Sequence, residues 1–150
     1  MAQRKLKVTW PTYHRLINKL GRDVKKSRFK PDIIVAISRG GLLVGRMLSE
    51  YFNKPLGVIT VQSYRATKQD RLRLDKRISS LYPIRGKILL VDDLVDSGKT
   101  LEITKAYLEK KGKVKTAVMY RKDCTMCEPD FFGANAPGST WIIFPYSKEG

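Results

Sequence analysis

The sequence predicts a single α/β domain in which helices flank a central, mostly parallel β-sheet. Apolar runs of strand length occur at residues 33–37, 56–61 and 88–91. They lack the polar alternation of a half-exposed strand, so they are typical of strands buried on both faces, as in parallel sheets. A segment with helical spacing separates the first two runs, as a βαβ unit requires. With 150 residues, 42% of them hydrophobic, the chain is long enough for one substantial core.

A first helix is predicted from about residue 9 to residue 26. Thr9 or Trp10 lies near its cap, and Pro11 falls in the first turn, where prolines are common. The apolar side chains that then recur at helical spacing are Tyr13, Leu16, Ile17, Leu20 and Val24. His14, the only histidine, has no second candidate ligand near it in the sequence, so we interpret it as a surface or packed residue.

Residues 33–61 are predicted to form a right-handed strand–helix–strand unit. The first strand ends in Ser38-Arg39-Gly40-Gly41, and the helix ends at residues 53–55, Asn-Lys-Pro. The apolar positions of that helix are Val44, Met47, Leu48 and Tyr51.

Residues 63–80 differ from the segments around them. They lack a clear apolar period, and residues 65–77 contain six basic and two acidic side chains. We interpret this segment as a mobile basic loop or a weak hairpin, because long loops inside compact domains are usually functional. A solvated excursion without a function is the alternative.

Residues 87–101 are the centre of the sequence. An apolar strand runs into Asp92 and Asp93, Asp96 follows three positions later, and the Ser-Gly-Lys-Thr turn at residues 97–100 opens a helix. The acids are expected at the carboxyl end of a core strand, where open α/β sheets bind ligands. The free N–H groups of the helix start form an anion site. The expected ligand therefore has hydroxyl groups at one end and a phosphate at the other.

The rest of the chain is predicted to complete the sheet. The helix ends at residues 110–113, a strand follows at 114–120, residues 128–140 are expected to be a loop, and residues 141–146 are a short terminal strand.

A nucleotide-binding P-loop is the competing interpretation of residues 97–100. That motif needs a glycine five positions before Gly98, and Asp93 stands there. A carboxylate at this place would repel phosphates, so a P-loop ATPase is not expected.

Residues 87–101 instead resemble the phosphoribosyl diphosphate (PRPP) signature of the type I phosphoribosyltransferases. The resemblance implies a three-layer fold with a small hood, built from residues 121–150 and the N-terminus, over a core at about residues 31–120. It also implies that Asp92 and Asp93 hold the ribose hydroxyls, with Asp93 as the partner of Mg²⁺. The residues expected to wrap the 5-phosphate are Asp96, Ser97, Gly98, Lys99 and Thr100.

Ser38-Arg39-Gly40-Gly41 resembles the diphosphate loop of the same family. The resemblance implies that Arg39, Gly40 and Gly41 bind PRPP and that the Ser38–Arg39 peptide bond is cis. The basic segment after Ser63 then corresponds to the mobile loop that closes over PRPP and excludes water.

The carboxyl-terminal part is similar to the 6-oxopurine branch, the hypoxanthine, guanine and xanthine salvage enzymes. The resemblance implies that Lys122 contacts the purine 6-oxygen, that Trp141 stacks on the base and that the backbone of Ile142 reads its edge. A solvated strand end for Lys122 and core packing for Trp141 are the alternatives. Ser147 departs from the pattern, because relatives often carry an acid there.

The charge and the cysteine content limit which partners are expected. Lys plus Arg is 30 and Asp plus Glu is 14, a formal charge of +16, which favours polyanionic partners. No apolar run could span a membrane and none resembles a signal peptide, so a cytoplasmic location is expected. Cys124 and Cys127 form one CxxC pair, for which ordinary thiols, zinc binding or redox chemistry stay open.

The resemblance implies purine salvage: PRPP and a 6-oxopurine give the nucleoside 5-monophosphate and diphosphate. Asp96 is the expected general acid/base at the purine N7, Mg²⁺ is the expected cofactor, and a dimer or tetramer is the expected assembly. One alternative is a PRPP-sensing regulator that binds nucleic acid, which the charge suits. Another is an enzyme for a different base, such as orotate or adenine.

Overall fold

The computed structural model describes residues 2–64 and 71–149, with side chains described outside residues 63–76. Its elements are β1 (Lys5–Lys7), α1 (Trp10–Lys26), β2 (Ile33–Ser38), α2 (Gly41–Phe52), β3 (Leu56–Tyr64), β4 (Arg71–Ser79), β5 (Gly86–Val95), α3 (Lys99–Glu109), β6 (Gly112–Lys122), β7 (Phe131–Ala136) and β8 (Trp141–Ile143). No helix in the described part of the chain is long and apolar enough to cross a membrane.

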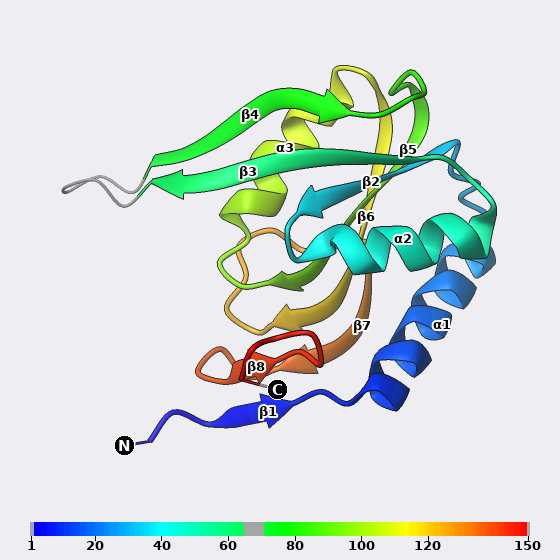
Figure 1. Ribbon diagram of the computed structural model, residues 1–150. Coiled ribbons are helices and arrows are strands. Elements are labelled where there is room, and N and C mark those ends of the chain that lie inside the picture. Colours follow the sequence, from blue (N-terminus) through cyan, green and yellow to red (C-terminus); the bar gives the residue numbers. More distant parts are fainter. Residues whose placement is uncertain (1, 65–70, 150) are drawn as a thin grey trace.

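The main sheet has the strand order β4-β3-β2-β5-β6-β7 (Figure 1). Every neighbouring pair in it is parallel except β3 and β4. A separate two-stranded sheet pairs β1 with β8 in parallel, so the two ends of the chain meet there. The predicted α/β fold with a mostly parallel central sheet is confirmed.

Helices cover both faces of the main sheet. Successive residues of a strand point to opposite sides, so each central strand contributes side chains to the core on both faces. Ile34 and Ala36 of β2 pack in one apolar cluster with residues of α1 and α2. Ile33, Val35 and Ile37 pack in a second cluster with Leu101 and Leu108 of α3. The result is three layers, with β2 and β5 at the centre of the sheet and buried on both sides.

The start of α1 agrees with its sequence signals. The Thr9 side chain accepts a hydrogen bond of 3.3 Å from the Thr12 N–H, and Pro11 lies in the first turn. The apolar stripe of the helix is buried against the sheet.

The pairing of β5 creates the edge at which the functional residues gather. β5 pairs with β2 only as far as Ala36 and Val91, but it pairs with β6 as far as Val95 and Arg121. The strand is therefore longer than the predicted 87–91. Asp92 and Asp93 lie within it, just past the point where β2 leaves.

Three sequence predictions need correction. Residues 131–136, predicted to be loop, form β7 at the edge of the main sheet. The terminal strand is only Trp141–Ile143, not 141–146. The predicted strand at 56–61 continues to Tyr64 and pairs with β4 in antiparallel fashion. Of the two forms predicted for the basic segment, a loop or a hairpin, the pairing agrees with the hairpin. Residues 65–70, the centre of the predicted mobile loop, lie outside the described residues.

Candidate active site

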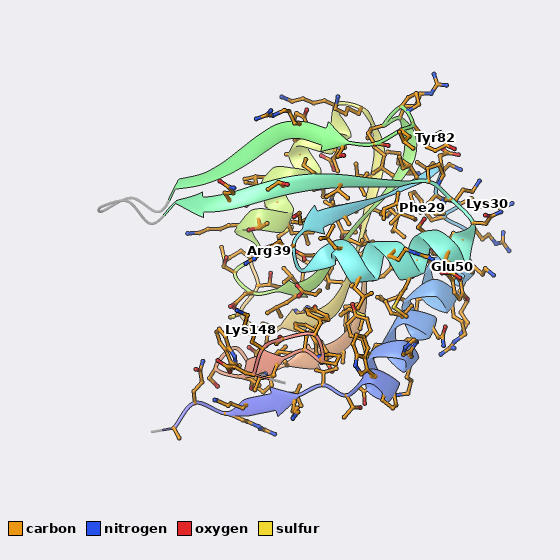
Figure 2. All side chains as sticks on the ribbon, in the orientation of Figure 1. Phe29, Lys30, Arg39, Glu50, Tyr82 and Lys148 are labelled. Carbon is orange, nitrogen blue, oxygen red and sulfur yellow. The ribbon has the colours of Figure 1, made fainter. Side chains whose placement is uncertain are left out.

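The β2–α2 loop lies directly against the acids of β5. The Ser38–Arg39 peptide bond is cis, as predicted. A Cβ added at Gly40 would lie 2.5 Å from the Asp93 carboxylate oxygens, and one at Gly41 would lie 2.6 Å from the Val91 carbonyl oxygen. Only glycines allow this approach. Arg39 is exposed beside the start of α2 (Figure 2).

The two adjacent acids share a partly buried position. Asp92 Oδ1 accepts a hydrogen bond of 2.8 Å from the Asp93 N–H. Burial raises the pKa of Asp92, and the neighbouring charge of Asp93 raises it further. Burial also raises the pKa of Asp93, against the opposing effect of a hydrogen bond from Tyr146. Among the side chains that the structure describes, no lysine or arginine forms an ion pair with either carboxylate.

Tyr146 contacts Asp93, which the sequence did not predict. Its hydroxyl donates a hydrogen bond of 2.8 Å to Asp93 Oδ2, and its ring stacks on Phe144 at 5.4 Å between centroids. The Tyr13 ring packs edge-on to Tyr146, and the buried Tyr13 hydroxyl finds no hydrogen-bond partner among the described residues. In the sequence, the one sign of this role is that Tyr146 is an aromatic residue directly after Phe144 and Pro145.

The turn after β5 encloses a cavity of about 200 Å³. Gly98 takes a φ of 90°, which favours glycine, and α3 begins at the next residue. The Ser97 hydroxyl accepts a 3.4 Å hydrogen bond from the Lys99 N–H, and Lys99 itself is exposed. The cavity is lined by Asp92, Asp93, Leu94, Val95, Asp96, Ser97, Gly98, Thr100 and Leu101.

Asp96 meets the end of β6. Lys122 Nζ donates to Asp96 Oδ2 at 3.1 Å, and the lysine side chain is only 8% exposed whereas that of Asp96 is 59% exposed. Cys124 Sγ lies 3.6 Å from the other carboxylate oxygen, Oδ1. Residues predicted as the catalytic acid and as the base-binding lysine are therefore neighbours.

Trp141 and Ile142 lie on the small sheet. The Trp141 side chain is half-exposed and that of Ile142 is buried. The Trp141 N–H donates to the Arg4 carbonyl, and the Ile143 carbonyl accepts from the Val8 N–H. Because alternate residues of a parallel strand face the same neighbour, the backbone N–H and C=O of Ile142 turn away from β1.

The cysteines lie in the turn after Lys122, and both are free thiols. Among residues 2–64 and 71–149, no three histidine, cysteine, aspartate or glutamate side chains gather closely enough to hold a metal ion by themselves.

The fold and the site bring acids, a glycine loop and the start of a helix together at the carboxyl ends of the central strands, the arrangement expected for a phosphorylated, hydroxyl-bearing ligand. A family model described as the phosphoribosyl transferase domain matches residues 9–146. The chain therefore belongs to the phosphoribosyltransferase family, and the prediction made from residues 87–101 is confirmed.

Individual relatives agree with this assignment. The chain is 33% identical over 151 aligned residues to a xanthine-guanine phosphoribosyltransferase of Idiomarina loihiensis, covering 99% of this chain and 90% of the relative. A purine phosphoribosyltransferase structure from Pyrococcus horikoshii superposes with a TM-score of 0.84 at 30% identity, covering 96% and 95% of the two chains. A Helicobacter pylori xanthine-guanine-hypoxanthine phosphoribosyltransferase superposes with a TM-score of 0.85 at 25% identity, covering 97% and 96%.

Proposed function

We propose that this protein transfers the 5-phosphoribosyl group of PRPP to a 6-oxopurine, giving a nucleoside 5-monophosphate and diphosphate. The observation that carries the proposal is a single continuous site. One cavity is lined by Asp92, Asp93, Asp96, Ser97, Gly98 and Thr100, and Asp96 is hydrogen-bonded to the buried Lys122. The purine names of the relatives support the choice of base.

The cavity fits the two ends of ribose 5-phosphate. Asp92 and Asp93 are acceptors at the strand end, suited to the ribose 2- and 3-hydroxyls. The start of α3 offers free N–H groups, and Ser97 and Thr100 add hydroxyl donors for the 5-phosphate. Lys99 would contribute through its backbone N–H, which in this structure donates to the Ser97 hydroxyl at 3.4 Å, since its side chain is exposed.

The diphosphate is assigned to the β2–α2 loop. Gly40 and Gly41 allow the backbone to lie against the acids, so an anion there would also be close to a metal held by Asp93. Arg39 supplies a positive charge at the same loop, suited to a leaving diphosphate.

The donor set fits Mg²⁺. This ion usually binds through one or two carboxylates, substrate oxygens and water, and the adjacent carboxylates of Asp92 and Asp93 match that need. When bound by Asp93 and PRPP, Mg²⁺ would neutralise charge on the diphosphate.

The base is assigned to the space beside Asp96. Lys122 is the donor for the purine 6-oxygen, Trp141 the stacking surface, and Ile142 the backbone reader, with its N–H and C=O free of the small sheet. Asp96 would hold the proton at N7, as a carboxylate positioned for general acid/base work.

The second candidate is a PRPP-sensing regulator that binds nucleic acid, which the charge of +16 favours. A regulator has no need of a buried lysine aimed at Asp96. Adenine carries an amino group at position 6 and would offer Lys122 no acceptor there. Orotate, a pyrimidine, has no N7 for Asp96 to face.

Incubation with PRPP, Mg²⁺ and separately hypoxanthine, guanine, xanthine, adenine and orotate tests these alternatives. We expect nucleotide from at least one of the first three. No product from any base, with tight and salt-sensitive RNA binding, would favour the regulator. The cytoplasmic location and the dimer or tetramer stay predictions.

A further inference from the structure

The thiol of Cys124 completes the contacts of the Asp96 carboxylate. Lys122 Nζ donates a hydrogen bond of 3.1 Å to Asp96 Oδ2. Cys124 Sγ lies 3.6 Å from Asp96 Oδ1 and 4.0 Å from the Asp96 backbone oxygen. Each carboxylate oxygen thus has its own partner. A thiol is a weak donor, but a charged acceptor strengthens the bond.

The turn that carries Cys124 is fixed against the cavity wall. The Met126 N–H donates to the Ser97 carbonyl at 2.9 Å, and a Cβ at Gly98 would lie 2.6 Å from the Cys127 nitrogen. On the opposite side, a Cβ at Gly138 would lie 3.1 Å from Cys124 Sγ. The backbone of this turn is therefore held close to Asp96, and the exposed Cys124 side chain reaches the carboxylate from that position.

We propose that Cys124 is a positioning residue, which together with Lys122 fixes the orientation of the Asp96 carboxylate toward the base. This inference rests on the proposed function. A carboxylate that is 59% exposed and held at one oxygen only can rotate about its terminal torsion, which is broad. A second contact at Oδ1 restricts that rotation, and small misplacements of a catalytic group are costly.

Three variants test the role. Cys124→Ala removes the donor, Cys124→Ser restores one, and Met126→Ala changes an exposed side chain in the same turn while keeping the backbone bond to Ser97. We expect Cys124→Ala to lower kcat by about three- to tenfold with the KM for PRPP unchanged, because orientation of Asp96 matters only to the chemical step. Cys124→Ser should recover most of the loss, and Met126→Ala should match wild type.

Wild-type kcat in Cys124→Ala would overturn the proposal. So would an equal loss of kcat in Cys124→Ala and Cys124→Ser, or a rise in the KM for PRPP as large as the fall in kcat, because either pattern indicates packing alone.

A second measurement does not depend on turnover. Alkylation of Cys124 by iodoacetamide at neutral pH, resolved from Cys127 by peptide mass spectrometry, is compared in wild type and Asp96→Asn. The thiol must give up its hydrogen bond to Asp96 before it reacts, and an amide is a weaker acceptor than a carboxylate, so we expect alkylation about threefold or more faster in the variant. Equal rates would overturn the contact itself. If wild type makes no nucleotide but the rates differ, the contact stands and the proposed function fails.

Discussion

The Tyr146 hydroxyl lies 2.8 Å from Asp93 Oδ2 and joins the segment after β8 to the end of β5. This bond holds the small sheet against the cavity, because Tyr146 also stacks on Phe144, which is buried in the core. The C-terminal segment therefore sets the position of a carboxylate proposed to bind ribose and metal.

Tyr146→Phe should destabilise the fold modestly. The variant keeps the stacked ring and removes one hydrogen bond to a charged acceptor, worth about 1 kcal/mol at this partly exposed position. The urea midpoint measures the loss. Tyr82→Phe, at an exposed tyrosine distant from this bond, is the control and should leave the midpoint unchanged. Equal effects in both variants would contradict the role assigned to the Tyr146 hydroxyl.

Gly40→Ala should damage PRPP binding. The added methyl would lie 2.5 Å from the Asp93 carboxylate, so either the loop or the acid must move. We expect the dissociation constant for PRPP, measured by calorimetry with Mg²⁺, to rise about tenfold or more. Gly57→Ala is the control, since its methyl would meet side-chain atoms only, Ile84 Cδ1 at 3.0 Å, Ser80 Cβ at 3.4 Å and Ile78 Cγ2 at 3.6 Å. Unchanged affinity in Gly40→Ala would show that this loop does not meet PRPP.

Lys122→Met should affect the base and spare PRPP. A bond from a charged donor to the purine oxygen is worth enough that kcat/KM for the base should fall about 10- to 100-fold. Lys115→Met, on the same strand but paired with Asp130, is the matched control and should be near wild type. A fall in PRPP affinity with unchanged base kinetics would refute the assignment of Lys122.

Asp96→Asn should lower turnover far more than PRPP binding. Loss of a general acid/base typically costs about a hundredfold or more in kcat, and the amide keeps the size of the side chain. Single-turnover kinetics and PRPP calorimetry separate the two effects. If kcat stays near wild type, Asp96 is not the acid/base.

The Arg121–Glu128 pair should make stability pH-dependent. Hydrogen bonds from Arg121, at 2.5 and 2.6 Å, lower the pKa of Glu128 in the folded state. Its contribution is therefore present above the unfolded-state pKa of about 4.3 and is lost as pH falls through the lower folded-state pKa. The urea midpoints of wild type and Glu128→Gln should differ at neutral pH and converge in strong acid. In an Arg121→Ala background the same substitution should show no such pH dependence.

Local patterns predicted the elements that carry their own signals. The apolar run of β2, the stripe of α1 and the acids of β5 could all be assigned from periodicity and turn chemistry. The strand β7 could not, because Gly133 and Asn135 weaken its pattern. Gly133 is required by tertiary packing: a Cβ there would lie 2.6 Å from the Met119 carbonyl and 3.2 Å from Leu16.

Contacts between distant segments were also beyond local reasoning. β1 consists of three exposed residues whose strand conformation depends on β8. The bond from Tyr146 to Asp93 spans 53 residues, and the contact of Cys124 with Asp96 spans 28. The family motif identified the acids, but only the fold brings these partners to them.

The most direct measurement of the central claim is product stoichiometry with the wild-type protein. PRPP, Mg²⁺ and the preferred 6-oxopurine are incubated, and nucleoside 5-monophosphate and diphosphate are quantified together. We expect both to form in equal amounts and Asp96→Asn to suppress both. Consumption of PRPP without nucleotide, or no consumption with any 6-oxopurine, would contradict it.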